Sequence, residues 1–218
     1  MEGRTVVAID GPAGSGKSTL AYRLAAELGL PYVNTGIMYR ALARRALQTG
    51  TDPADGPALR RLLEGIGFEV DRSRTPPSLV VDGAMPGEEL STPEVEALVS
   101  TVARHPEVRR AMAERQRELG REGAVMEGRD IGTVVFPDAA AKIFLDASAD
   151  ERAGRRTRER EGEAGVAEGL AERDLRDARV NPFVPAPDAV LVDTAGAGPD
   201  EVFLRALRVV REALGGRR

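Results

Sequence analysis

The sequence of 218 residues contains no cysteine, no tryptophan and a single histidine, His105. Without cysteine there can be no disulfide bond, no thiolate nucleophile and no zinc site with cysteine ligands. One histidine is too few for a metal site built from several imidazoles. A bound metal ion would therefore need oxygen ligands, as Mg2+ prefers.

Long hydrophobic runs are missing as well. No stretch approaches the roughly 18 consecutive apolar residues of a membrane span, and the first apolar run, residues 5–9, ends at Asp10 before it could act as a signal peptide. Positive charge is not in excess either, because 31 basic residues face 35 acidic ones and the net charge is −4. We therefore expect a cytoplasmic protein that binds neither a membrane nor a nucleic acid.

The residues that are present are typical of a soluble globular protein. Hydrophobic residues make up 42% of the chain and charged residues 30%, and the length predicts one domain. Nearly all the basic residues are arginines, since Lys17 and Lys142 are the only lysines. Few amide side chains and abundant charge fit a thermophilic source or a biased codon usage, and the sequence does not decide between them.

Short apolar runs alternate with amphipathic stretches along the whole chain. The predicted strands are residues 5–10, 31–34, 124–126, 142–146 and 189–193, and the predicted helices are residues 18–29, 38–47, 92–103, 105–120, 150–179 and 200–214. This alternation predicts an α/β fold in which a parallel five-stranded sheet is covered by helices on both faces. Residues 66–90 interrupt the alternation with two short runs around a polar turn, which predicts a small β-rich insert.

A phosphate-binding loop follows the first predicted strand. Residues 11–18 fit the pattern G-x-x-x-x-G-K-[ST] and lie between a strand and a helix, the context that this motif requires. Backbone N–H groups of the loop and the helix N-terminus would bind the phosphates, with Lys17 adding a mobile charge and Ser18 a ligand for Mg2+. The sequence therefore predicts that ATP and Mg2+ bind at Gly11, Pro12, Ala13, Gly14, Ser15, Gly16, Lys17, Ser18 and Thr19.

The same loop occurs in GTPase switches, in motor ATPases and in kinases of small molecules. Residues 193–196 have the D-x-x-G form of a GTPase phosphate sensor, which favours a nucleotide-binding switch. However, they follow Lys17 by about 175 residues, and the sequence has no N-K-x-D motif that would read guanine. A strand that ends in a polar turn is therefore the preferred explanation of residues 193–196.

An arginine cluster favours a kinase. Five arginines lie within nine residues, namely Arg152, Arg155, Arg156, Arg158 and Arg160. A kinase that phosphorylates an anionic acceptor needs positive charge to hold two anions together, and a lid to exclude water. Because glutamates are interleaved with these arginines, a solvated charged helix is the alternative. Arg155 and Arg156, adjacent and central in the cluster, are our candidates for catalytic residues beside Lys17.

Four segments resemble the bacterial type of cytidylate kinase. They are residues 11–19, the stretch N-T-G-I-M-Y-R at 34–40, the stretch E-G-R-D-I-G-T-V-V-F-P at 127–137, and residues 142–148. The third is highly specific, and the resemblance extends over nearly the whole chain, including the β-rich insert. It implies transfer of the γ-phosphoryl group of ATP to CMP or dCMP, giving ADP and CDP or dCDP.

The resemblance also implies the organisation of the chain. The fold would be the three-layer fold of P-loop NTPases, in a single domain that acts as a monomer. Its three parts would be a core at about 1–34, 121–150 and 180–218, a monophosphate-binding lobe at about 35–120, and a short helical lid at about 150–165.

For the acceptor, the resemblance assigns the phosphate to Arg40 and Arg129, in a pocket lined by Thr35 and Tyr39. Three further residues, Ser100, Arg109 and Asp130, are assigned to the cytosine base. These types are chemically suitable, because cytosine offers an amino donor to a carboxylate, and acceptors to a hydroxyl and a guanidinium group.

The resemblance assigns the ribose to Arg173 and Asp177, and a later phosphate contact to Arg179. The chain is shorter than the family pattern between Asp177 and Pro185, which leaves the role of Arg179 open. Catalysis would come from alignment and charge neutralisation, since the acceptor phosphate is itself a nucleophile near neutral pH. A P-loop kinase of another pyrimidine monophosphate, such as UMP, and a non-enzymatic switch are the alternatives.

Overall fold

The computed structural model describes residues 5–152, 154 and 184–216. The predicted helix at 150–179 and the lid at 150–165 therefore lie largely outside the described residues. The same is true of several predicted site and cluster residues, namely Arg155, Arg156, Arg158, Arg160, Arg173, Asp177 and Arg179.

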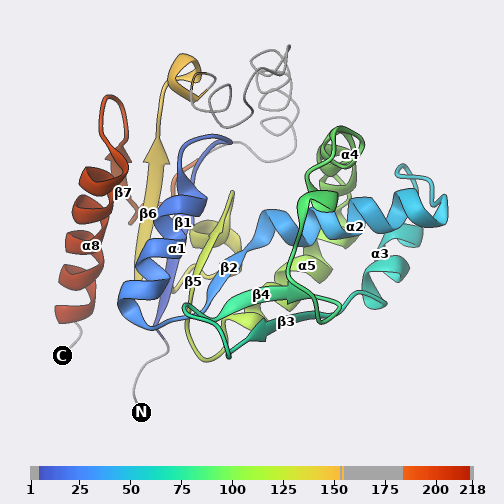
Figure 1. Ribbon diagram of the computed structural model, residues 1–218, viewed down its shortest axis with the longest axis horizontal. Helices are drawn as coiled ribbons and strands as arrows, with labels where there is room; N and C mark the ends of the chain where they lie inside the picture. Colours follow the sequence, from blue (N-terminus) through green and yellow to red (C-terminus); the bar gives the residue numbers. More distant parts are fainter. Residues whose placement is uncertain (1–4, 153, 155–183, 217–218) are drawn as a thin grey trace.

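One twisted sheet organises the fold, with the strand order β3-β4-β2-β5-β1-β6-β7 (Figure 1). Five of its strands are those that the sequence predicts, and they run parallel to one another: β1 (Val6–Asp10), β2 (Tyr32–Asn34), β5 (Ala124–Gly128), β6 (Ala141–Asp146) and β7 (Val190–Asp193). The predicted α/β fold with a mainly parallel sheet is confirmed, but the sheet has seven strands and not the predicted five. The first strand and the P-loop that follows it lie in the middle, with β5 on one side and β6 on the other.

The β-rich insert is a hairpin of β3 (Phe68–Asp71) and β4 (Ser78–Val81), as the two apolar runs predict. The sequence did not predict that this hairpin would continue the main sheet. Tyr32 pairs with Ser78 in parallel register, and its N–H donates to the carbonyl of Pro77 at 2.8 Å. The sheet therefore has seven strands, and the hairpin covers an edge of β2 that would otherwise be open to solvent.

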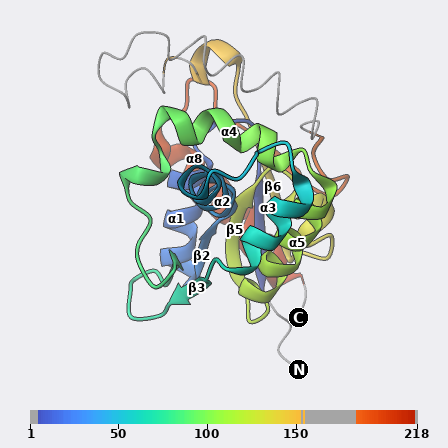
Figure 2. The ribbon, with the colours of Figure 1, turned by 90° about the vertical axis from the view of Figure 1, so that its right-hand side faces the viewer.

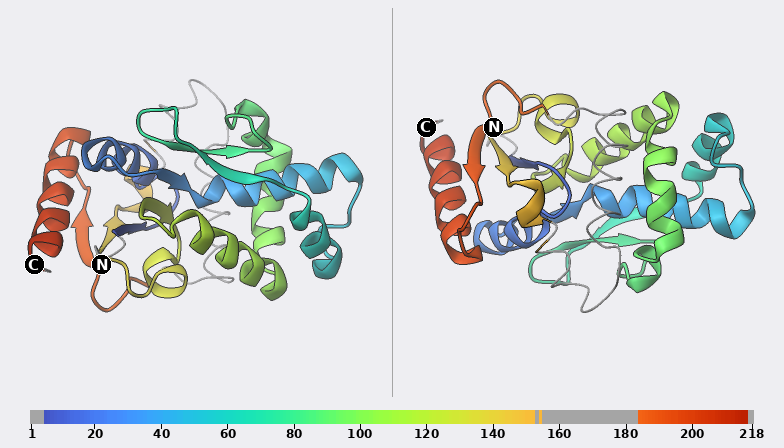
Figure 3. Two further views of the ribbon diagram at one scale, coloured as in Figure 1. Left: turned by 90° about the horizontal axis from the view of Figure 1, so that it is seen from below. Right: turned by 90° about the horizontal axis from the view of Figure 1, so that it is seen from above.

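Helices cover both faces of the sheet, and the alternation of side chains along β1 shows how. Val7 and Ile9 point to one face and pack with α1 (Lys17–Leu28) and α8 (Pro199–Gly215). Val6 and Ala8 point to the other face and pack beneath η2 (Ile131–Val135), a single π-helical turn, and the end of α5 (Pro106–Leu119). The structure is thus a three-layer α/β fold (Figure 3).

A second group of helices lies on the side away from α8. It comprises α2 (Thr35–Thr49), α3 (Gly56–Glu64), α4 (Pro93–Ala103) and the start of α5, with a short 3-10 turn, η1 (Glu88–Leu90), beside them. Figure 2 looks along α2, with the other helices of the group around it. Their apolar faces form one buried cluster that includes Met38, Leu59 and Met112. We call this group, with the hairpin, the α2–α5 lobe.

The sequence missed α3, although its signals are present. Asp55 caps the helix by accepting a hydrogen bond from the Ala58 N–H at 2.9 Å, and Pro57 stands in the first turn. Leu59 and Leu63, four residues apart, are its buried face. In the described part of the chain, no helix combines the length and the apolar character that crossing a membrane would require.

Candidate active site

The predicted phosphate-binding loop connects β1 to α1 at the C-terminal edge of the parallel strands. Gly11 and Gly16 have backbone φ values of 149° and 91°, which residues with a Cβ atom rarely adopt. Helix α1 begins at Lys17, so its positive end faces the loop. The ammonium group of Lys17 turns back and donates to the carbonyl of Pro12 at 2.6 Å. The positive helix end and the Lys17 charge beside the loop are suited to an anionic group.

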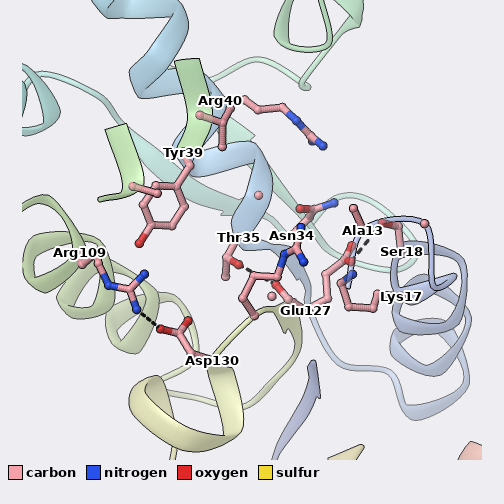
Figure 4. Close-up of a pocket in the computed structure, with 16 residues that line it drawn as sticks. Ala13, Lys17, Ser18, Asn34, Thr35, Tyr39, Arg40, Arg109, Glu127 and Asp130 are labelled. Carbon is pink, nitrogen blue, oxygen red and sulfur yellow. Dashed lines mark hydrogen bonds and ion pairs between the residues drawn. The ribbon is translucent and has the colours of Figure 1, made fainter. Parts of the chain in front are cut away.

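A cleft runs from this loop towards the α2–α5 lobe (Figure 4). Ten of the predicted site residues line it, namely Ala13, Gly14, Lys17, Ser18, Thr35, Tyr39, Arg40, Arg109, Arg129 and Asp130. Residues from four separate stretches of the chain thus converge on one cleft. The phosphate loop forms one end of it, and the Arg109 and Asp130 side chains lie at the other.

The start of α2 forms the wall between the two ends. Asn34 caps this helix by accepting a hydrogen bond from the Ile37 N–H at 3.2 Å. The hydroxyl of Thr35 donates to the carbonyl of Glu127 at 2.7 Å and thereby fastens the helix to the end of β5. Tyr39 and Arg40 follow one helical turn after Thr35 and line the same cleft.

An ion pair closes the far end of the cleft. Arg109 of α5 donates to the carboxylate of Asp130, which follows β5, with 2.6 Å between Nη2 and Oδ2. Both side chains keep some solvent contact, with exposed fractions of 27% and 20%. Enclosure by protein raises the pKa of the neighbouring Tyr39 hydroxyl, and the Asp130 charge raises it further, so Tyr39 stays neutral. The pair presents a carboxylate and a guanidinium group side by side.

The sequence profile of the family described as cytidylate kinase matches residues 7–212. The chain belongs to the cytidylate kinase family. A cytidylate kinase of Thermus thermophilus is 45% identical over 95% of this chain and 99% of its own length. The protein of the same name from Solibacter usitatus is 45% identical, over 95% of this chain and 93% of its own. A third, from Anoxybacillus flavithermus, is 43% identical over 99% of this chain and all of its own length.

Sequence analysis assigned no role to Glu127, which in this member of the cytidylate kinase family is central to the cleft. Its side chain is 3% exposed at the end of β5. The Ser18 hydroxyl donates to Oε2 at 3.1 Å, and the Tyr32 hydroxyl donates to Oε1 at 2.6 Å. Burial and the Glu127 charge raise the pKa of Tyr32, so Tyr32 stays a donor. A glutamate that ends a buried strand was the available signal.

Two other residues that the sequence singled out, Ser100 and Arg152, lie outside the wall of the cleft. Ser100 is buried on α4 beside Val99, which lines the cleft, but Ser100 is not among the described lining residues. Arg152 is only 8% exposed and donates to the carbonyls of Ala13 and Ala147, each at 3.2 Å. Arg152 therefore braces the phosphate loop, unlike a residue of a solvated charged helix.

A second cavity lies on the other side of the phosphate loop. Its walls are formed by loop and α1 residues such as Ser15 and Thr19, and by the turn after β7, including Thr194 and Gly196. The D-x-x-G segment is therefore next to the loop despite its distance in sequence. The Gly196 N–H donates to Glu151 at 3.0 Å, and the N–H and hydroxyl of Ser148 donate to the same carboxylate.

Proposed function

We infer that this chain is a cytidylate kinase that transfers the γ-phosphoryl group of ATP to CMP or dCMP, giving ADP and CDP or dCDP. The match of the family profile over residues 7–212 carries this conclusion. The cleft supports it, because a phosphate-binding loop faces a carboxylate and guanidinium pair across one continuous space. Such an arrangement suits a nucleotide whose phosphate points to the loop and whose base points away from it.

The acceptor is held, in our proposal, by the residues that the family resemblance assigns. Asp130 accepts from the amino group of cytosine, and Arg109 donates to the ring acceptors, with Ser100 nearby. Arg40 and Arg129 hold the acceptor phosphate. Thr35 and Tyr39 line its pocket. The 2.6 Å contact between Arg109 and Asp130 supports the proposal, since each residue keeps the other in place for the base.

Replacing either Arg109 or Asp130 should weaken the binding of CMP far more than the binding of ATP. A hydrogen bond to a charged group is worth about 1.5–3 kcal/mol, so we expect the KM for CMP to rise tens-fold in Asp130→Ala and in Arg109→Met. The KM for ATP should stay unchanged. Steady-state kinetics with each substrate varied in turn measures both values.

The control for this pair is Arg115→Met. Arg115 lies on the same helix as Arg109, but its exposed side chain pairs with Glu118 outside the cleft. Both KM values should equal those of the unmodified enzyme. A rise in the KM for ATP with an unchanged KM for CMP in the Asp130 or Arg109 variants would show that the base lies elsewhere.

The donor side requires Mg2+, and the residues present fit it. Among the described residues there is no cluster of three or more acidic or histidine side chains that could hold a metal ion by itself. The Ser18 hydroxyl and the Glu127 carboxylate, 3.1 Å apart, offer hard oxygen ligands beside the phosphate loop. This suits Mg2+, which keeps several waters and binds through substrate phosphates. When bound, the ion would neutralise phosphate charge, with Ser18 and Glu127 holding it.

We propose that the base of ATP occupies the second cavity, between α1 and the turn after β7. Glycine, alanine and proline form much of this wall, which leaves room for a flat ring against the backbone. Lys17 would then lie between the donor and acceptor phosphates. No proton-abstracting residue is needed, because orientation and charge neutralisation supply the rate enhancement.

Five residues outside the described part of the chain complete the proposal. Arg173 and Asp177 contact the ribose of the acceptor, Arg179 contacts phosphate, and Arg155 or Arg156 meets the transferring phosphoryl group. Alanine scanning tests these roles. By analogy with arginine fingers, replacing either Arg155 or Arg156, whichever meets the phosphoryl group, by alanine should lower kcat roughly 10^3-fold. Arg60→Ala, on the exposed side of α3, should leave turnover unchanged. Wild-type turnover in both lid variants would move that role to another arginine.

The proposed organisation is one domain with a core, an acceptor lobe at about 35–120 and a lid at about 150–165. One buried cluster drawn entirely from residues 37–119 supports the lobe. We also propose a cytoplasmic monomer of pyrimidine nucleotide metabolism. The cleft supports the monomer, because a single chain supplies the phosphate loop, the α2 wall and the ion pair.

The decisive experiment is an acceptor panel. CMP, dCMP, UMP, AMP and GMP are each incubated with ATP and Mg2+, and ADP release is followed. We expect rapid turnover with CMP and dCMP and little with the purine nucleotides. A preference for UMP over both cytidine nucleotides would favour the alternative pyrimidine kinase, and no turnover with any acceptor would favour a non-enzymatic switch.

A further inference from the structure

A buried carboxylate joins the strand of the phosphate loop to the segment that carries Asp130. Asp10 ends β1, directly before Gly11, and is 7% exposed. Its Oδ1 accepts a hydrogen bond from the N–H of Ile131 at 2.8 Å, and its Oδ2 accepts one from the N–H of Gly132 at 2.7 Å. Each carboxylate oxygen thus holds one amide of the first residues of η2.

These two amides belong to the residues that immediately follow Asp130. Strands β1 and β5 run side by side, with Asp10 opposite Gly128, and the chain leaves the sheet just after that pair. The π-helical turn that follows begins at Ile131. Single π-helical turns are rare and occur frequently at functional sites. The position of Asp130 over the cleft therefore depends on how the start of η2 is held.

We propose that Asp10 is a positioning residue for the acceptor base, because its carboxylate clamps the Ile131 and Gly132 amides and so sets where Asp130 meets Arg109. This inference rests on the proposed function of the Arg109 and Asp130 pair. Since Gly11 follows Asp10 directly, the same residue also ties the acceptor end of the cleft to the phosphate loop. One side chain thus contributes to the relative placement of donor and acceptor.

The chemistry of the clamp explains why the position holds an acid. Two backbone donors need two acceptor atoms, and a carboxylate supplies both. Asparagine has one oxygen, and its amide nitrogen would face a second donor. A glycine at position 132 also suits the clamp, because a larger residue would crowd it. A Cβ atom there would lie 3.3 Å from Oδ2 of Asp10 and 3.2 Å from the Lys142 side chain.

Burying the Asp10 carboxylate away from water has a cost in free energy, which indicates that the residue does more than fill space. Burial raises the pKa of Asp10 to about 6, although the two amides and, more weakly, the Lys17 charge lower it. Asp130 raises it further, and the Lys142 side chain also lies beside Gly132. Below about pH 6 the carboxyl becomes neutral, one oxygen carries a proton, and the clamp loses an acceptor.

Asp10→Asn tests the proposal with the smallest change of shape. We expect the KM for CMP to rise roughly tenfold or more, with the KM for ATP within about twofold, and the melting temperature to fall modestly because one buried N–H loses its acceptor. A purely structural role would instead change both KM values together. The matched control is Asp200→Asn, whose side chain is 91% exposed on α8, and which should change none of the three.

Amide NMR gives a readout that does not depend on substrate or activity. In the enzyme without nucleotide, the Ile131 and Gly132 amide resonances should shift with pH around a midpoint near 6. In Asp10→Asn this titration should vanish. Invariant resonances in the unmodified enzyme, or an unchanged KM for CMP in the variant, would overturn the inference. If the unmodified enzyme does not phosphorylate CMP, the proposed function fails, whereas the NMR titration still decides whether the clamp exists.

Discussion

Lys17→Ala should lower kcat at least about a hundredfold while the protein stays folded. Removing one group that stabilises developing charge in a transition state costs that much in other enzymes. Lys17 stands at the first position of α1, between the phosphate loop and the cleft, and its ammonium group donates to the Pro12 carbonyl at 2.6 Å. In the proposed mechanism, this is where the phosphates of ATP meet the acceptor. The measurement is ADP release at saturating CMP and ATP.

The fold should survive this change, because the Lys17 side chain is not part of a buried cluster. Circular dichroism and the melting temperature check this directly, and Arg60→Ala serves as a charge-matched surface control. A folded Lys17→Ala enzyme that keeps more than about a tenth of the normal kcat would contradict the mechanism. A rise in the KM for ATP with kcat unchanged would mean that Lys17 binds substrate and transition state equally well.

Gly11→Ala should disrupt both the phosphate loop and the fold. A Cβ atom at Gly11 would lie 2.5 Å from the backbone carbonyl oxygen of Leu145 and 3.1 Å from the Ser15 hydroxyl, at a φ of 149°. The carbonyl belongs to a buried strand and cannot move aside, so the loop must shift. We expect a loss of roughly 3 kcal/mol in the free energy of unfolding. For a chain of this size the melting temperature would fall by about 6–12 °C.

Gly29→Ala separates the strain of the backbone from the clash. Gly29 also has a positive φ, 64°, at the end of α1, but a Cβ atom there would meet nothing within 4 Å. This variant should lose about 1 kcal/mol of stability and keep normal ATP binding. Gly11→Ala should additionally lose ATP affinity, measured by calorimetry at a temperature where it is folded. Equal effects of the two substitutions would show that the close approach to Leu145 is unimportant.

The parts of the fold that could be predicted are those in which local pattern and tertiary context agree. The run at residues 6–10, followed by the loop motif, specifies both a buried strand and the turn after it. Helix α4 begins where Thr92 accepts a hydrogen bond from the Val95 N–H, as the Thr-Pro pair predicts. Helix α3 was missed because Asp52 and Pro53, residues typical of a loop, directly precede the cap at Asp55, and the Ala54 N–H donates to the Asp52 side chain in a turn.

The parts of the site that could not be predicted depend on pairing between distant segments. Glu127 has a role only because β5 lies beside β1 and β2, which brings it to Ser18 and Tyr32. Its place at the end of a buried strand is a local signal, but that place alone assigns no role. Arg152 likewise belongs by sequence to a charged helix, whereas its contact with the Ala13 carbonyl depends on the end of β6 reaching the phosphate loop.

The two large buried clusters described above have a consequence for how the molecule opens. One draws on residues 37–119 and fills the α2–α5 lobe, and the other packs α1 and α8 against the parallel strands. The lobe is nevertheless joined to the sheet, because α5 also contributes to the cluster beneath η2 that contains Val6 and Ala8 of β1. Helices α3 and α4 do not contribute to that cluster, so they can open locally while the central strands stay intact. We therefore expect the slowest amide hydrogen exchange in β1, β5 and β6.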